Sequence, residues 1–170
     1  MQLILKGCTI RPWRLDDAES LAKHANSRKV WLGVRDLFPH PYTIRDAHEF
    51  LQRTVEDQVT TKFCIEINNR AVGGMGIHPG QDVHSHTATL GYWLGEDFWG
   101  QGIMTDAVSA LTDFWFQNTP VRRISADVFA NNPGSARVLE KAGFVLEGRL
   151  KNCVIKNGEL LDSLVYAKTR

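Results

Sequence analysis

The stretch between Thr87 and Phe129 limits the possible folds more than any other part of this sequence. Thr87–Leu94 and Arg123–Phe129 each predict a strand, and the residues between them carry apolar side chains at helical spacing from Ile103 onward. Two neighbouring strands joined through a helix pair in parallel, because the helix carries the chain back to the starting edge of the sheet. We therefore expect a mixed sheet with helices packed against it.

Two helices are expected before this unit. Asp16 is the predicted N-cap of the first, which follows a strand over Leu3–Arg11. Thr43 and Asp46 form a capping-box pattern at the start of the second, with Asp in place of the usual Glu. The apolar spacing in that helix predicts that it buries Ala47, Phe50, Leu51 and Val55.

Two turns that contain asparagine predict antiparallel hairpins. Asn68-Asn69 suits a tight turn because asparagine tolerates positive φ. Asn157-Gly158 is the strongest short hairpin signal in the chain. The hairpins are expected to join Thr61–Ile67 to Ala71–Ile77 and Phe144–Ile155 to Leu160–Ala167.

The last helix is expected between the second parallel strand and the final hairpin. Pro133 suits its first turn, and Gly143 is the expected stop. The complete order predicts an α/β protein of the mixed α+β type. Its sheet is expected to be mixed and mostly antiparallel, with about seven strands flanked by about four helices.

The composition is that of an ordinary globular protein and argues against several classes. Lys and Arg number 20 and Asp and Glu 19, so the net charge of +1 argues against a broad basic surface for nucleic acid. No apolar window reaches the roughly 18 residues of a membrane span, and we expect a cytoplasmic protein without a membrane partner. Cys8, Cys64 and Cys153 are far apart and indicate neither zinc nor a disulfide framework. The length predicts one domain, residues 1–170.

A glycine-containing turn after the strand Thr87–Leu94 is the first candidate site. Gly100 and Gly102 allow the backbone to approach a ligand closely, and the amides at a helix start attract phosphate or pyrophosphate. The pattern is neither GxGxxG nor a Walker loop. These residues alone leave two interpretations open. The turn binds an anion, or it needs glycine only for its backbone geometry.

Three separated segments stand out by their order and spacing. They are Phe38-Pro39-His40-Pro41-Tyr42-Thr43, then Leu90–Leu94 with Trp99–Thr105, and finally Asn132–Phe144. Together they resemble the GNAT acyltransferase superfamily, in particular its branch of RimJ/RimL-like protein N-terminal acetyltransferases. The resemblance covers about Leu3 to Lys168 and implies the GNAT fold, with a splayed sheet.

The resemblance also implies a site for acetyl-CoA between the strands Thr87–Leu94 and Arg123–Phe129. The amides of Gly100–Thr105 are expected to hold the pyrophosphate, and the strand edge near Trp93 and Leu94 to pair with the pantetheine arm. The expected coenzyme residues are Trp93, Leu94, Trp99, Gly100, Gln101, Gly102, Ile103, Met104, Thr105, Asn132 and Ser135.

The expected chemistry lacks the family's carboxylate base. Relatives often carry glutamate at the positions of Thr89 and Val154, so Thr89 is expected at most to order a water. Ser135 lies where the family places a hydroxyl near the thioester sulfur, although Asn132 and Ser135 also suit an ordinary helix start. Proton relays remain open at His78, His84 and His86, and no metal site is expected.

The leading hypothesis is an acetyl-CoA-dependent N-acetyltransferase in which a primary amine, most simply a protein N-terminus, attacks the thioester directly. The resemblance implies that Phe38 and Tyr42 line the amine site; the alternative is that they only pack their loop onto the core. A small-molecule amine acetyltransferase, for a polyamine, amino acid or antibiotic, remains open. So do a non-catalytic acyl-CoA sensor, an acyl group other than acetyl, and a homodimer.

Overall fold

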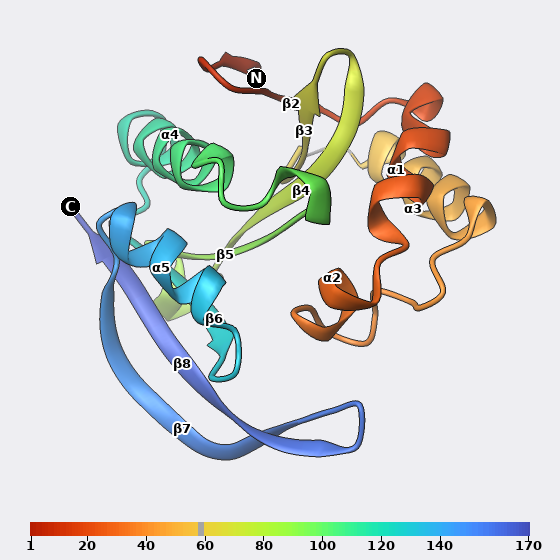
Figure 1. Ribbon diagram of the computed structural model, residues 1–170. Coiled ribbons are helices and arrows are strands. Elements are labelled where there is room, and N and C mark those ends of the chain that lie inside the picture. The colour runs from red at the N-terminus through yellow and green to blue at the C-terminus, as the bar shows by residue number, and fades with distance from the viewer. Residues whose placement is uncertain (58–59) are drawn as a thin grey trace. The chain divides into compact units, whose positions relative to one another are not determined.

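A computed structural model describes residues 1–57 and 60–170 of the chain (Figure 1). The described chain divides into two compact units. The N-terminal unit comprises Met1–Gly76 and Tyr92–Ile103, and the C-terminal unit comprises Ile77–Gly91 and Met104–Arg170. Two strands, β4 (Arg70–Pro79) and β5 (Thr87–Leu94), each run from one unit into the other.

The strands confirm the expected mixed sheet. The other strands are β1 (Leu3–Ile4), β2 (Thr9–Pro12), β3 (Lys62–Ile67), β6 (Arg123–Phe129), β7 (Val145–Lys156) and β8 (Glu159–Thr169). Their order in the sheet is β1-β2-β3-β4-β5-β6-β8-β7. β5 and β6 pair in parallel, which agrees with the predicted crossover. The described residues form eight strands and five α-helices, against expectations of about seven and about four.

The N-terminal segment is a hairpin rather than the single strand expected over Leu3–Arg11. β1 and β2 pair antiparallel, and the Leu5 amide donates to the Cys8 carbonyl across the turn (2.9 Å). The chain then passes through the 3-10 turn η1 (Leu15–Asp17) into α1 (Ala18–Ala25). Asp16 is not the helix cap, because Asp17 occupies the N-cap position.

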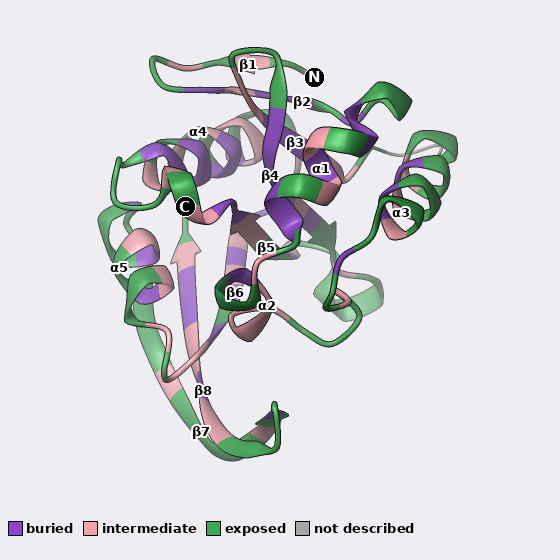
Figure 2. Cartoon of the chain, turned by 45° about the vertical axis from the view of Figure 1, so that its right-hand side comes forward, coloured by how far each residue is buried: buried purple, intermediate pink, exposed green. Residues whose placement is uncertain are grey.

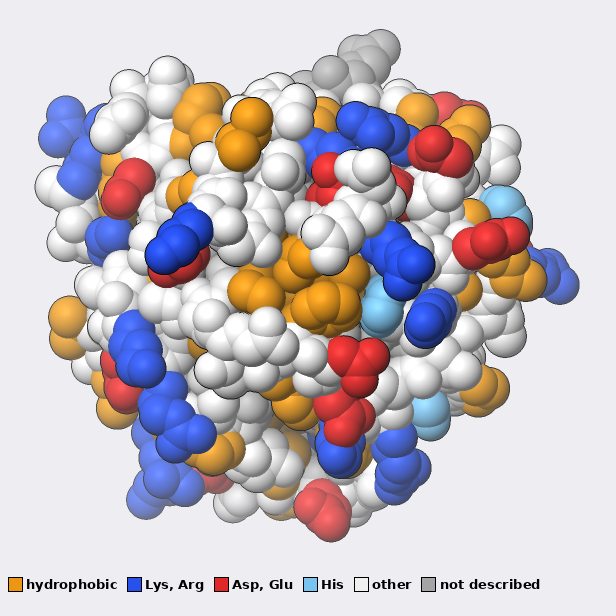
Figure 3. All heavy atoms as spheres, turned by 45° about the horizontal axis from the view of Figure 1, so that its top comes forward, with side chains coloured by type: hydrophobic (Ala, Val, Ile, Leu, Met, Phe, Trp, Pro, Cys, Tyr) orange, Lys and Arg blue, Asp and Glu red, His pale blue; other side chains and the backbone are white. Residues whose placement is uncertain are grey.

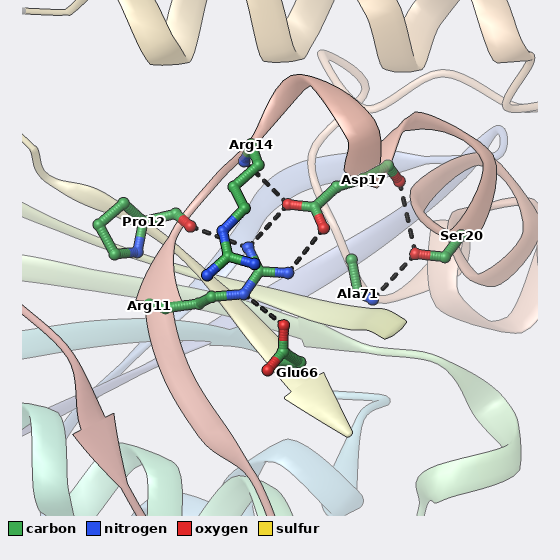
Figure 4. A network of polar contacts seen from close by, with 7 residues as sticks. All are labelled: Arg11, Pro12, Arg14, Asp17, Ser20, Glu66 and Ala71. Atoms are coloured by element: carbon green, nitrogen blue, oxygen red, sulfur yellow. Dashed lines mark hydrogen bonds and ion pairs between the residues drawn. The ribbon is translucent and has the colours of Figure 1, made fainter. Parts of the chain in front are cut away.

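A buried ion-pair network explains why Asp17 turns inward (Figure 4). The Arg11 side chain is 2% exposed and donates to both carboxylate oxygens of Asp17, at 2.9 and 2.7 Å. Its Nε also donates to Glu66 on β3 (2.5 Å), and these bonds, that to Asp17 foremost, raise the pKa of the guanidinium. The Asp17 carboxylate accepts the Arg14 amide as well (2.9 Å). The network therefore joins β2, η1 and β3 through one charge that is satisfied in its buried site.

The N-terminal unit contains three α-helices: α1, α2 (Arg28–Leu32) and α3 (Ile44–Glu56). The short α2 is absent from the sequence-based expectation, and Ser27 caps it by accepting the Val30 amide (3.4 Å). The predicted capping box of α3 is confirmed. The Thr43 amide donates to the Asp46 carboxylate (2.7 Å), and the Asp46 amide donates to the Thr43 hydroxyl (3.2 Å).

The helix α3 buries one face, which Figure 2 shows as purple bands among green. Ala47 and Leu51 are fully buried, and Phe50 packs edge-on against Trp13 with ring centroids 5.4 Å apart. Val55, expected to be buried, is 47% exposed. It lies in the last turn of the helix, beyond the core cluster that covers Ala47 and Leu51.

In the C-terminal unit, α4 (Ile103–Asn118) and α5 (Pro133–Lys141) accompany the strands β6, β7 and β8. β6 pairs with β8 along its whole length, from Arg123 to Phe129. The expected boundaries of α5 are confirmed, since Pro133 is its first residue and Gly143 follows its end with φ of +86°.

Both predicted hairpin turns are confirmed. Asn68 and Asn69 have φ of 49° and 60°, and β3 pairs antiparallel with β4 around them. Asn157 and Gly158 have φ of 51° and 79° between β7 and β8. Asparagine and glycine are the residues that reach positive φ at low cost, and their positions therefore set both strand registers.

Replacing Asp17 by alanine is expected to lower the free energy of unfolding by about 3 kcal/mol, because the buried Arg11 guanidinium would keep only Glu66 as an ionic partner. The matched control is Glu49→Ala, which removes an exposed ion pair with Arg45 on α3 and should change stability little. Urea unfolding of both variants measures the difference. Equal losses would contradict the structural role of the network.

Candidate functional site

The parallel pairing between β5 and β6 covers only three residue pairs in the described chain. Thr87, Ala88 and Thr89 pair with Arg123, Ile124 and Ser125. Both strands continue past this point, and β6 does so against β8. Backbone amides and carbonyls require hydrogen-bond partners, and an open strand edge accepts an extended ligand as an added strand. The later part of β5, residues 90–94, is therefore a candidate binding edge.

The glycine turn, residues 99–102, connects the 3-10 turn η3 (Glu96–Phe98) to α4. Gly100 and Gly102 have φ of +74° and +80°, and a Cβ at either would meet no atom of the described chain within 4 Å. Gln101 is exposed as well, whereas the Ile103 and Met104 side chains are 7% exposed. A ligand at this turn would therefore contact backbone amides. The 16-residue α4 directs the positive end of its dipole there.

Side-chain hydrogen bonds that the sequence analysis missed hold the glycine turn in shape. Trp99 donates its indole N–H to the Leu94 carbonyl (2.8 Å). Gln101 donates its side-chain amide to the Asp97 carbonyl (3.0 Å). Two residues expected to contact the coenzyme thus also close the turn onto the end of β5 and onto η3.

Two adjacent glycines in β4 permit a close approach of β5. A Cβ at Gly73 would lie 2.7 Å from the Trp93 carbonyl oxygen, and a Cβ at Gly74 would lie 2.7 Å from the Trp93 indole nitrogen. Neither position has room for a side chain. Glycine inside a strand often marks a place where another backbone comes close. The Gly73-Gly74 pair is therefore the sequence signal that predicts the close approach of β5.

Asn132 and Ser135 meet at the start of α5. The Asn132 side-chain oxygen accepts the Ser135 amide (3.1 Å), which makes Asn132 the N-cap. The Asn132 backbone amide donates to the Phe129 carbonyl at the end of β6 (2.8 Å). Because the cap uses the side-chain oxygen, a ligand carbonyl at Asn132 would have to accept from the side-chain NH2 group.

Thr89 lies on the exposed face of β5. Its neighbours Ala88 and Leu90 are 2% and 3% exposed, and their side chains point to the opposite face of the strand. Thr89 forms the last pair of the parallel ladder, with Ser125. Val154 lies on β7, directly after the irregularity in its pairing with β8. Neither Thr89 nor Val154 supplies a carboxylate.

Phe38, Tyr42 and Trp93 form an aromatic group within the N-terminal unit. The Phe38 ring centroid lies 4.8 Å from that of Tyr42 and 5.4 Å from that of Trp93. A predicted acceptor residue therefore touches a predicted coenzyme residue. Tyr42 is 6% exposed and belongs to the core cluster, and burial raises the pKa of its phenol to about 12. Tyr42 thus supports Phe38 from the core, the packing role that the sequence analysis left open.

A metal site requires a group of His, Cys, Asp or Glu side chains that lie close together. Within residues 1–57 and 60–170, no three or more His, Cys, Asp or Glu side chains are placed to hold a metal ion. His78 and His84 are exposed, and the His86 Nδ1 lies 3.0 Å from the Pro120 carbonyl oxygen. Cys8, Cys64 and Cys153 are thiols rather than disulfide partners in the described chain.

Charges of both signs share the surface. On the face drawn in Figure 3, Lys and Arg side chains lie among Asp and Glu side chains. Ion pairs between charged side chains of the described chain include Arg123–Glu147 and Arg149–Asp162. A separate finding concerns the helices: none in the described part of the chain combines the length and apolarity needed to cross a membrane.

Comparison with protein families and curated proteins gives a consistent result. The family model described as an acetyltransferase (GNAT) domain matches residues 8–145. A probable N-acetyltransferase of Bacillus subtilis, YjcK, is 46% identical over 174 residues, which cover 96% of each chain. The ribosomal-protein-serine acetyltransferase of Escherichia coli is 39% identical over 82 residues, which cover 48% of this chain and 46% of that protein.

A solved structure supports the same fold. Mycobacterium smegmatis RimJ, in complex with CoA-disulfide, superposes with a TM-score of 0.85 and 25% sequence identity. The superposition covers 99% of this chain and 85% of that chain.

The burial of Tyr42 predicts a loss of stability at alkaline pH. The phenol has a pKa of about 12 in the folded chain, against an ordinary value of 10.0, so the unfolded chain loses its proton first. The stabilising effect is complete below pH 10 and is lost as the pH rises towards 12. Across this interval the free energy of unfolding should fall by up to about 2–3 kcal/mol relative to Tyr42→Phe. Urea unfolding of both proteins over this pH range measures the difference; parallel pH profiles would contradict the prediction.

Proposed function

The chain belongs to the acetyltransferase (GNAT) family and is an acetyl-CoA-dependent N-acetyltransferase, and on that basis we propose that its acceptor is the amine of a protein N-terminus. The observation that carries this proposal is the 39% identity to the ribosomal-protein-serine acetyltransferase of Escherichia coli. The RimJ structure, at 25% identity, gives further support. A small-molecule amine is the competing acceptor, and the experiment below distinguishes the two.

The backbone of the glycine turn and of β5 is the proposed binding surface for the coenzyme. The amides of residues 100–105 bind the pyrophosphate, a role supported by the positive φ of Gly100 and Gly102 and by the start of α4. The edge of β5 at Trp93 and Leu94 pairs with the pantetheine arm. The short parallel ladder, which covers three pairs, supports this second role.

The start of α5 is proposed to hold the reacting end of the coenzyme. The Asn132 NH2 group donates to a pantetheine carbonyl, while its side-chain oxygen keeps the helix cap. The Ser135 hydroxyl, in the first turn of the helix, stabilises the thiolate that leaves. The support for both roles is the capping geometry that fixes these residues together.

The proposed reaction is direct attack within a ternary complex. The neutral amine forms a bond to the thioester carbonyl carbon, and the carbon–sulfur bond then breaks to release the coenzyme thiolate. A backbone amide of β5 donates to the carbonyl oxygen as negative charge develops there. Ser135 donates a hydrogen bond to the departing sulfur. The proton that the nitrogen loses passes to water ordered by Thr89, and the thiolate takes up a proton from that water, so the products are the amide and the coenzyme thiol.

Positioning replaces a strong base in this proposal. Well-oriented reactants gain about 7–11 kcal/mol over the same groups in solution. Phe38, supported by Tyr42 and in contact with Trp93, forms a wall for the acceptor. Thr89 and Val154 bear no carboxylate, so the amine has to enter in its neutral form. Activity should therefore rise with pH as more of the amine is unprotonated.

We also propose the setting in which the enzyme works. Residues 1–170 act as one acetyltransferase domain, which is supported by a family match that draws on both compact units. Cysteines that stay as thiols in the described chain support a reducing compartment, the cytoplasm. The open alternatives of a homodimer and of an acyl group other than acetyl are tested by sedimentation and by assays with longer acyl-CoAs.

The acceptor is tested with acetyl-CoA and a panel of N-terminal peptides, polyamines and amino acids, with thiol release as the measurement. Faster release with peptides than with small amines supports the proposal. Preference for a small amine would identify the competing enzyme class. Coenzyme A binding without release for any amine would indicate the sensor that the sequence analysis left open.

Gly102→Val should abolish measurable coenzyme A binding in a protein that remains folded, because the side chain forces the glycine turn out of its positive-φ geometry. Gly158→Val is the matched control, since Gly158 has a similar φ of +79° and equally open surroundings in the β7–β8 turn. Calorimetry measures both affinities. Equal affinity in wild type and a folded Gly102→Val variant would contradict the proposed pyrophosphate site.

Ser135→Ala should lower kcat by about one to three orders of magnitude while coenzyme A affinity stays nearly unchanged. The substitution keeps the backbone amide that Asn132 caps, so the start of α5 should persist. Thr89→Val should reduce kcat less, because Thr89 only orders water in the proposed reaction. A Ser135→Ala enzyme with normal kcat and a lower Tm would assign the hydroxyl a structural role.

A further inference from the structure

Glu96, the first residue of η3, binds two residues at the start of α2. Its carboxylate accepts from the Ser27 hydroxyl (3.1 Å) and forms an ion pair with Lys29. These bonds cross 69 and 67 positions in the sequence, and all of the residues lie in the N-terminal unit. The bond to Lys29 is the main reason why the pKa of Glu96 is lowered, so the carboxylate is ionised at neutral pH.

The Ser27 hydroxyl also forms a second hydrogen bond, which links the contact with Glu96 to the start of α2. Ser27 is the N-cap of α2, and its oxygen accepts the Val30 amide. The hydroxyl therefore has one orientation in which it donates to Glu96 and caps the helix at the same time. Moving Glu96 disturbs both bonds, and a five-residue helix has few other hydrogen bonds with which to compensate.

On its other side, η3 is fixed to the glycine turn. Trp99 follows η3 directly, and its indole N–H donates to the Leu94 carbonyl. Gln101 reaches back to the Asp97 carbonyl within η3. The Phe98 ring packs edge-on against His24 of α1, with centroids 5.4 Å apart. A shift of the glycine turn is therefore passed to Glu96 through a short segment with several anchors.

From α2, contacts continue to the segment that contains the proposed acceptor wall. The Trp31 ring of α2 stacks on His40, with centroids 5.6 Å apart and planes 26° from parallel. The Tyr42 amide donates to Asn26, just before the Ser27 cap (3.0 Å). The position of α2 therefore bears on His40 directly and on Tyr42 through Asn26, which precedes the Ser27 cap.

We propose that Glu96 is a positioning residue that couples coenzyme binding at the glycine turn to the placement of α2 and residues 38–42, and so to acceptor binding. The inference rests on the proposed function, which puts the coenzyme at the glycine turn and the acceptor at Phe38. Glu96 touches neither reactant. It transmits the ordering of one binding segment to the other through the Ser27 cap and Lys29.

The exposure of this cluster distinguishes positioning from stability. Glu96 and Lys29 side chains are 39% and 67% exposed, and such pairs contribute little to global stability. Their contact nevertheless lies between η3, which leads into the glycine turn, and α2, which contacts His40. Removing the contact between Glu96 and Lys29 should therefore alter the response of α2 to coenzyme binding more than it alters the free energy of unfolding.

Hydrogen exchange of the full chain, with and without coenzyme A as the probe, tests the coupling. In wild type, coenzyme A should slow exchange both in residues 99–105 and in residues 27–33. In Glu96→Ala, the slowing at 99–105 should persist, whereas the slowing at 27–33 should weaken by about two- to fivefold, the range of an exposed ion pair. Glu96→Gln keeps an oxygen acceptor for Ser27 and should restore most of the effect.

Two further variants complete the design. Glu49→Ala removes an exposed ion pair of the same unit on α3 and should leave both responses unchanged. Lys29→Met removes the ion pair but keeps the bond between Ser27 and Glu96, so only part of the slowing at 27–33 should be lost. This variant tests the coupling even if α2 unfolds in Glu96→Ala. Wild-type slowing confined to 99–105, or an unchanged response in Glu96→Ala, would overturn the coupling and leave the proposed function intact. No slowing at 99–105 in wild type would overturn both.

Discussion

Backbone groups in a sheet need hydrogen-bond partners. On the facing edges of β5 and β6, the three-pair ladder supplies such partners to the first residues of each strand. β6 goes on to pair fully with β8, whereas β5 continues to Leu94 and leads into the glycine turn. The proposed coenzyme residues lie on this part of β5, on the turn after it and on the helix after β6. The end of the β5–β6 ladder therefore marks the place where we propose that the coenzyme binds. The chain has no carboxylate at Thr89 or Val154 to mark that place.

The residues of the candidate site also hold the local fold together. Asn132 caps α5, Trp99 closes the glycine turn on Leu94, and Tyr42 fills the core behind Phe38. A side chain that is fixed by one structural bond presents its remaining polar groups in a defined direction, and this reduces the entropy lost on binding. Glu96 extends the same principle from a single residue to two segments, α2 and η3.

Local signals predicted much of the fold, because they depend on residues that are close in sequence. The Asn68-Asn69 and Asn157-Gly158 turns, the Thr43–Asp46 box and the Pro133 helix start all formed as expected. The family resemblance, by contrast, supplied the coenzyme and the candidate residue roles. The features that the sequence did not predict depend on residues that are far apart in the chain. Asp16 and Asp17 are indistinguishable in the sequence, and only Arg11 and the buried position decide between them. Glu96 meets Ser27 across 69 positions, so no local pattern indicates it.

The Gly73-Gly74 pair has a consequence for how such a chain can change over generations. Each added methyl group would fall 2.7 Å from an atom of Trp93, and in Gly73 that atom belongs to the backbone. A side chain at Gly73 would have to shift the backbone of β5, whose edge is the proposed platform for the coenzyme, and a side chain at Gly74 would displace the Trp93 indole. Acceptor preference can diversify through the loop around Phe38, where side chains reach the surface. Substitutions at Gly73 and Gly74 would instead disturb the packing of β4 against β5. A mutational library built to alter acceptor specificity therefore gains nothing by including these two positions.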